Sequence, residues 1–167
     1  MPMADRPPSI TTWVGLDVGG VAYALNIQCV REIIRPLPMQ SLPHAAKVVI
    51  GVVDHRGDVV PVIDLRVRFG TGERMDLAHT RWVIATRGER LVGLVVDRVT
   101  EVFRLNSHDA REVPDLGPHG DRRGVTAAYS HRGRLVFALD IDRVTRTDEE
   151  PWPLPLLAES VPAAEAS

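Results

Sequence analysis

Four times along the chain, an apolar segment is followed by a glycine turn and a second apolar segment. The second segments are "GGVAYALNIQCV", "RGDVVPVIDLRV", "RGERLVGLVVDRV" and "RGRLVFALDIDRV", at residues 19–30, 56–67, 87–99 and 132–144. Their upstream partners are "TWVGLDV", "VVIGVVD", "TRWVIAT" and "GVTAAYS". Glycine supplies the positive φ of a tight turn, and runs rich in Val, Leu and aromatic residues favour strands. The pattern predicts four hairpins in an all-β domain.

Each hairpin leads to a short polar residue near its end. Asn26, Asp64 and Asp140 are predicted to cap short helical turns, because their side chains accept backbone amide hydrogens, and Asp97 fits this role least well. Pro61 would remove a ladder hydrogen bond from an apolar strand, so we expect that strand at a sheet edge or bulge. The unequal spacing of the hairpins argues against a propeller and favours small, closed or nearly closed barrels.

One segment, residues 27–34, is predicted to form a helix. Its apolar side chains recur at helical spacing, and the proline at position 36 would end the helix. The residues on the predicted face are Ile27, Val30, Ile33 and Ile34.

Composition sets the class of protein. The 167 residues are 44% hydrophobic and 25% charged, which is typical of a globular protein with one domain or two small fused ones. A net charge of −2 and a pI near 6.3 argue against nucleic-acid binding. The single cysteine, Cys29, excludes an intramolecular disulfide. No apolar run approaches the ~20 residues of a membrane span and no signal peptide is evident, so we expect a cytoplasmic protein with no membrane insertion.

The two ends differ from the body. We expect a flexible N-terminus at residues 1–11, a domain at residues 12–146, and a Pro/Ala-rich tail at residues 147–167. The apolar residues of the tail are expected to dock on the body or, less favourably, on a partner. They are Trp152, Leu154, Leu156 and Leu157.

The sequence offers little catalytic chemistry. Six histidines are scattered, and no helical i, i+4 histidine pair, nucleophile elbow or phosphate-binding loop occurs. We therefore expect no enzymatic activity, no metal and no cofactor. The triplet His-Arg-Gly appears twice, at residues 55–57 and 131–133, and hairpin turns account for both. The alternative is a small enzyme or ligand sensor that uses His55 and Arg56 at a small-molecule pocket.

Three blocks in order resemble the CheW-like coupling proteins of bacterial chemotaxis. They are "YALNIQCVREII", "GVVDHRGDVVPVIDLRVRFG" and "RLVGLVVDRVTEVFRL", at residues 23–34, 51–70 and 90–105. The resemblance, which extends over residues 12–144, implies two intertwined five-stranded SH3-like β-barrels with one or two short helices and a hydrophobic seam between them. We expect barrel one at residues 12–53 plus 125–146, and barrel two at residues 54–124.

The resemblance also implies a function. Such proteins are non-enzymatic adaptors that hold a CheA-type histidine kinase, through its regulatory domain, against the cytoplasmic tips of methyl-accepting chemoreceptors. The expected location is the cytoplasm, at membrane receptor arrays. A scaffold in a pathway that controls surface motility or development is the alternative with different partners.

Site residues follow from the family motifs. "VREI" resembles V-x-E-I and "DHRG" resembles N-L-R-G, which implies that Glu32 and Arg56 face each other as a coupled docking pair. The implied receptor-binding groove comprises Val30, Glu32, Ile33, Arg56, Val96 and Val99. The implied kinase interface comprises Gly51, Arg81 and Trp82.

Two departures from the family motif lie beside this pair. Asp54 and His55 stand where the family has Asn and Leu. The added negative charge predicts that two carboxylates hold Arg56. Arg132, in the second triplet, has no counterpart among the family's docking residues, and we expect it to be merely solvated.

Overall fold

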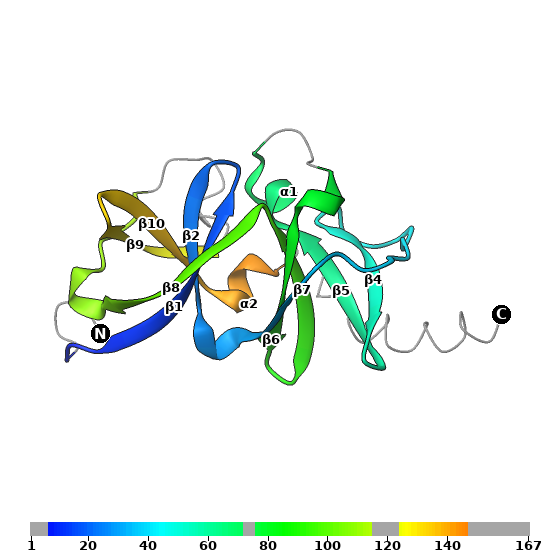
Figure 1. Ribbon diagram of the computed structural model, residues 1–167, viewed down its shortest axis with the longest axis horizontal. Helices are drawn as coiled ribbons and strands as arrows, with labels where there is room; N and C mark the ends of the chain where they lie inside the picture. The colour runs from blue at the N-terminus through cyan, green and yellow to red at the C-terminus, as the bar shows by residue number, and fades with distance from the viewer. Residues whose placement is uncertain (1–6, 72–75, 115–123, 147–167) are drawn as a thin grey trace.

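The computed structural model describes residues 7–71, 76–114 and 124–146. Within them, ten strands form two five-stranded sheets (Figure 1). Barrel one contains β1 (Ile10–Val18), β2 (Val21–Asn26), β8 (Arg98–Asn106), β9 (Val125–His131) and β10 (Arg134–Leu139), in the order β8-β1-β2-β10-β9. Barrel two contains β3 (Val30–Ile34), β4 (Val49–His55), β5 (Asp58–Asp64), β6 (Arg81–Arg87) and β7 (Arg90–Val96), in the order β3-β6-β7-β5-β4. The predicted all-β fold is confirmed.

Each barrel is built from both halves of the chain. The hairpin β1–β2 belongs to barrel one, whereas the next three strands, β3–β5, belong to barrel two. The second half reverses this, because β6–β7 belongs to barrel two and β8–β10 returns to barrel one. The parallel pairs β2–β10 and β5–β7 join the pieces. The expected barrel boundaries are therefore corrected: β3 and β4 lie in barrel two, and β8 lies in barrel one.

The predicted helix at residues 27–34 is wrong. A single 3-10 turn, η2 (Ile27–Cys29), leads directly into strand β3, which pairs antiparallel with β6. Along Val30–Ile34 the side chains alternate between half-buried and exposed, which is the period of a strand. Three of these five residues are β-branched and prefer a pleated surface to a helix.

Short polar caps end the hairpins as predicted. Asn26 accepts the amide hydrogen of Gln28, and Asp64 and Asp140 begin α1 (Leu65–Phe69) and α2 (Ile141–Val144) in the same way. Two further 3-10 turns, η3 (Leu77–His79) and η4 (Ser107–Asp109), follow the same rule. No helix in the described part of the chain is long and apolar enough to cross a membrane.

Of the two alternatives predicted for the strand of Pro61, the sheet edge is wrong, whereas an irregularity of the bulge type lies close by. Strand β5 has β4 on one side and β7 on the other. Pro61 pairs with Val52 of β4, whereas pairing with β7 begins one residue later, at Val62. A register shift lies nearby in β4, between Val49 and Gly51.

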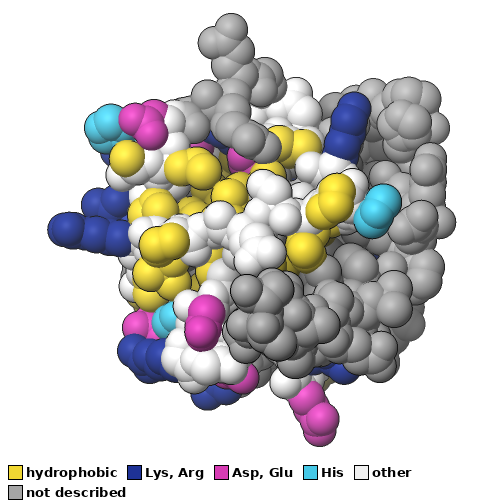
Figure 2. Space-filling view, turned by 90° about the vertical axis from the view of Figure 1, so that its right-hand side faces the viewer, with side chains coloured by type: hydrophobic (Ala, Val, Ile, Leu, Met, Phe, Trp, Pro, Cys, Tyr) yellow, Lys and Arg dark blue, Asp and Glu magenta, His cyan; other side chains and the backbone are white. Residues whose placement is uncertain are grey.

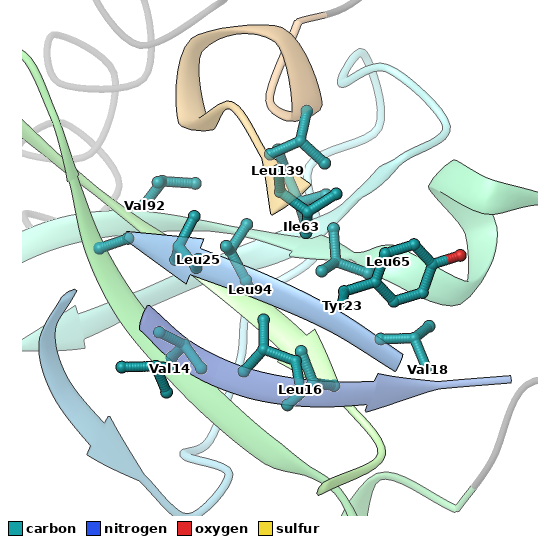
Figure 3. Packing of buried hydrophobic residues seen from close by; sticks show 14 of the residues in the cluster. Val14, Leu16, Val18, Tyr23, Leu25, Ile63, Leu65, Val92, Leu94 and Leu139 are labelled. Atoms are coloured by element: carbon teal, nitrogen blue, oxygen red, sulfur yellow. The ribbon is translucent and has the colours of Figure 1, made fainter. Parts of the chain in front are cut away.

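A shared hydrophobic cluster, which we call the seam, lies between the two sheets (Figure 3). Leu16 and Leu25 reach it from barrel one and Ile63 and Leu94 from barrel two, and all four are fully buried. Each such side chain stabilises the fold by about 1.5–3 kcal/mol relative to an exposed one. The two barrels are therefore joined by core packing, as the implied hydrophobic seam requires.

Each barrel also has an interior of its own. Barrel one encloses Leu105 and Tyr129 with Trp13 packed beside them, and barrel two encloses Trp82 and Ile84. Partly buried apolar side chains extend the barrel-two cluster toward the surface: Ile34, Leu37, Met39, Ile50, Leu77 and Leu91. In Figure 2, which looks onto the β4–β5 end of the molecule, hydrophobic side chains gather between charged ones.

Candidate functional site

The first His-Arg-Gly triplet forms a two-residue hairpin turn between β4 and β5. Arg56 and Gly57 both have positive φ, 52° and 85°, the combination of a type I′ turn. The Asp54 carboxylate accepts the Gly57 amide hydrogen at 2.9 Å. The turn projects Arg56 outward, with its side chain 74% exposed.

Glu32 on β3 receives two basic side chains from this turn. Arg56 Nη2 donates to Glu32 Oε1 at 2.9 Å, and His55 Nε2 lies 3.1 Å from Glu32 Oε2. The predicted juxtaposition of Glu32 and Arg56 is confirmed, although Glu32 lies on a strand. The expectation that two carboxylates hold Arg56 is wrong, because Asp54 caps the turn instead. We call Glu32, His55 and Arg56 the barrel-two clamp.

The second triplet forms the same arrangement in barrel one. Arg132 and Gly133 also have positive φ, 52° and 75°. Glu101 on β8 lies 2.9 Å from His131 Nε2 through Oε1 and 3.4 Å from Arg132 Nη1 through Oε2. The expectation that Arg132 is merely solvated is therefore wrong, although its side chain is 77% exposed. We call Glu101, His131 and Arg132 the barrel-one clamp.

The implied groove residues have different environments. Val30 and Val99 are half-buried and pack against the seam, and Ile33 is 44% exposed. The structure brings Val30, Glu32 and Ile33 together on β3. Val96 is fully buried within the seam, so its side chain offers no surface to a receptor. The groove assignment of Val96 is corrected to a core role.

The implied kinase-interface residues also differ in how far they are buried. Trp82 is fully buried inside barrel two, so it is a core residue and not a surface anchor. Gly51 is buried beneath the segment containing Met39 and Gln40. Arg81 keeps a partly exposed side chain, which donates to the Thr80 carbonyl oxygen at 2.9 Å.

Asp97 is the aspartate that fits a capping role least well. It instead connects the β7–β8 junction to α1 and to the β1–β2 turn. Both of its carboxylate oxygens accept from Arg66 of α1 at 2.7 Å, and Oδ2 also accepts the Gly19 amide hydrogen of the β1–β2 turn at 2.8 Å. The hydrogen bond to Asp97 raises the pKa of Arg66, against the lowering effect of burial. A similar hydrogen bond to Asp17 raises the pKa of Arg98. These pairs connect elements of the fold.

The clamps suit recognition of charged protein surfaces. Each carboxylate neutralises a guanidinium while leaving most of that guanidinium in solvent, so further acceptors can reach its N–H groups. His55 and Arg56 are both engaged by one carboxylate. Across the described ranges, no group of three or more His, Cys, Asp or Glu side chains is placed to hold a metal ion.

Two intertwined five-stranded barrels with a Glu–Arg pair between edge strand β3 and the β4–β5 turn define the class of protein. A sequence model described as the CheW-like domain matches residues 12–149, and the chain belongs to that family. It is 29% identical to the chemotaxis protein CheW of Rhizobium meliloti over 136 residues, which cover 81% of this chain and 88% of that protein. It is 28% identical to CheW of Helicobacter pylori over 140 residues, 83% and 84% of the two chains.

A solved structure has the same fold. The crystal structure of the scaffolding protein TtCheW from Thermoanaerobacter tengcongensis matches with a TM-score of 0.75 and 22% identity. The match covers 87% of this chain and 94% of the other.

Proposed function

We propose that this protein is a non-enzymatic adaptor that couples methyl-accepting chemoreceptors to a CheA-type histidine kinase. The observation that carries the proposal is the Glu32–Arg56 pair, formed by the residues that match the family's V-x-E-I and N-L-R-G motifs. Relatives named as chemotaxis proteins and a neighbour named as a scaffolding protein support it. The corresponding place of action is the cytoplasm, at receptor arrays.

The receptor docks beside the seam in this proposal. Val30 and Val99 are half-buried on β3 and β8, and Ile33 is exposed next to Glu32. Small aliphatic side chains of this kind accept the i, i+3 and i+7 anchors of an amphipathic helix. Arg56 then offers its exposed N–H groups to acceptors on the helix or on the kinase.

The kinase regulatory domain docks on the β4–β5 end of barrel two. Arg81 is partly exposed on β6, and half-buried apolar side chains such as Leu37, Met39 and Ile50 lie over the barrel-two interior. Apolar side chains among charged ones match the usual anatomy of a protein interface (Figure 2). Gly51 contributes by allowing the segment containing Met39 to lie close to β4.

A three-component binding experiment tests the proposal. The chain is mixed with the CheA-type kinase and a soluble receptor cytoplasmic fragment from the same organism, and complexes are separated by size-exclusion chromatography. We expect one complex that contains all three proteins. Ile33→Arg should remove the receptor fragment and retain the kinase, whereas Ile10→Arg, an exposed position at the start of β1, should retain both. Failure of the unaltered chain to bind either protein contradicts the proposal.

A further inference from the structure

The barrel-two clamp lies on the side of β3 that faces the interior of barrel two. Glu32 pairs with Ile84, which is buried in the barrel-two cluster. The next residue, Ile33, pairs with Val83, which is buried in the seam. Because cross-strand partners share a face of the sheet, Glu32 and Ile33 point to opposite sides of β3. The clamp is therefore separate from the seam and lies on the barrel-two side, where the kinase is proposed to dock.

His55 contacts the inner side of this clamp. Its Nε2 atom lies 3.1 Å from Glu32 Oε2, while Arg56 donates to the other carboxylate oxygen, Oε1, at 2.9 Å. The His55 side chain is 11% exposed and the Arg56 side chain is 74% exposed. Histidine is the side chain that ordinarily changes its charge between about pH 5 and 8, whereas arginine stays charged. One carboxylate thus joins a mostly buried group of variable charge to an exposed group of fixed charge.

Charged side chains approach His55 from three strands. Glu32 comes from β3, and Asp58 is the cross-strand partner of His55 at the start of β5. Asp54 and Arg56 flank the histidine in the sequence of its own hairpin. Three of these four charged groups are acidic, and the arginine is the docking residue of the proposed function. A proton on His55 therefore reduces the negative charge that surrounds Arg56.

The equivalent histidine of barrel one has a different setting. His131 lies 2.9 Å from Glu101 through Nε2 and stacks on Phe103 with the ring centroids 4.3 Å apart. Its cross-strand partner is Arg134, where His55 has an aspartate. The two turns thus place cross-strand partners of opposite charge beside equivalent histidines. Only the proton on His55 would offset acidic charge in its own hairpin.

We propose that His55 is a positioning residue that couples the docking of the kinase through Arg56 to the uptake of a proton. This inference rests on the proposed function and deepens it. Because a proton on His55 adds positive charge beside Glu32, the carboxylate then attracts the guanidinium of Arg56 less strongly. The guanidinium becomes more available to an acidic acceptor on the kinase. Since such coupling is reciprocal, docking and protonation favour each other, and the kinase binds more tightly at lower pH.

Calorimetric titration with the CheA-type kinase of the same organism tests this. The affinity is measured at about pH 6 and about pH 8, in two buffers of different protonation enthalpy, so that proton uptake is measured directly. We expect the full chain to bind roughly fivefold more tightly at the lower pH, the lower end of couplings between linked sites, and to take up protons. His55→Gln keeps an amide donor for Glu32, and His55→Leu restores the residue of the family motif; both should lose this pH-dependent gain. His108→Gln, which changes an exposed histidine on η4 of barrel one, is the control and should keep it.

The outcomes separate this inference from the proposed function. The kinase's own titratable groups affect all variants alike, so the same pH dependence in the full chain and both His55 variants overturns the inference and leaves the proposed function intact. Tighter binding by the full chain at the higher pH overturns it as well. Loss of all binding in both His55 variants also overturns it, because that result assigns His55 a structural role. If the full chain does not bind the kinase at either pH, the proposed function fails together with the inference.

Discussion

The Glu32 carboxylate lies 3.1 Å from Nε2 of His55, a histidine that stands where the family motif carries leucine. The His55 side chain is only 11% exposed, whereas the neighbouring Arg56 is mostly in solvent. The histidine therefore contacts Glu32 from the inner side, and the arginine contacts it from the solvent side. In the proposed function, the exposed Arg56 serves docking and contributes little to the stability of the fold.

Arg56→Ala should weaken partner binding far more than folding. An exposed ion pair contributes about 0–1 kcal/mol to stability, so the melting temperature should fall by about 4 °C or less. Loss of the guanidinium from an interface should lower affinity tenfold or more. Thermal unfolding and a binding titration on the same protein sample measure both effects. A large drop in melting temperature would assign Arg56 a structural role. Arg132 is unsuitable as the control, because it has its own carboxylate, and Arg90→Ala takes that place.

Gly51→Ala should destabilise the domain. A Cβ atom built there would come within 2.4 Å of the Met39 Cγ and 2.7 Å of the Gln40 carbonyl oxygen, so the covering segment must move. Overpacking of this kind costs about 1–3 kcal/mol. Gly93→Ala is the matched control, since its Cβ would meet neighbours no nearer than 3.5 Å. Urea unfolding of both variants decides the matter, and equal stabilities would show that the segment containing Met39 moves freely.

Asp97→Ala should be among the more damaging single changes. It removes the carboxylate that binds the mostly buried Arg66 and also leaves the Gly19 amide without its acceptor. Removal of one partner from a mostly buried ion pair costs about 3–5 kcal/mol. Asp142→Ala removes a mostly exposed carboxylate 3.8 Å from Arg87 and should cost at most about 1 kcal/mol. Comparable unfolding free energies for the two variants would contradict the structural role of Asp97.

The free energy of unfolding should decline in alkaline solution, because two buried tyrosines, Tyr23 and Tyr129, have raised pKa values in the folded protein. Burial raises the pKa of Tyr23, which stacks on Phe69, and of Tyr129, where Asp109 adds to the effect. The unfolded chain therefore loses these protons first, near pH 10. The contribution of the protonated tyrosines to stability is fully present below that pH. It is lost as the pH rises through the pKa values that the tyrosines have in the folded protein. Urea unfolding at a series of pH values should show this decline, and the double Tyr→Phe variant should show less of it.

Local signals predicted the hairpins well. Glycine turns, β-branched runs and the caps at Asn26, Asp64 and Asp140 each act within a few residues, and the structure has all of them. The segment containing Ile33 was misassigned because its apolar spacing fits one helical face and also a strand in contact with the seam. Its tertiary pairing with β6 decides between the two. The exchange of strands between barrels has no local signal, since it arises from the parallel pairing of β10 with β2.

The candidate site was predicted only in part. The family motifs indicated Glu32 and Arg56, but nothing in those motifs marks His55 as a third member. The barrel-one clamp was missed, although its signal was in the sequence: a second V-x-E segment at residues 99–101 and a second His-Arg-Gly triplet. The family resemblance places Val96 in the groove, and a tryptophan beside an arginine on a strand is typical of an interface anchor. Both residues are buried because this chain packs both faces of β6 and β7.

The exchange of strands between the two halves has a consequence during biosynthesis. When the first half leaves the ribosome, β1–β2 lacks β8 and β10 and β3–β5 lacks β6 and β7, so apolar faces that later form the seam meet water. At ~5–20 residues per second, the missing strands arrive on the order of ten seconds later. Neither barrel can close before then, because its partners lie in the later half of the chain. Until then, the nascent chain exposes apolar surface and unpaired strand edges, which are features that promote aggregation.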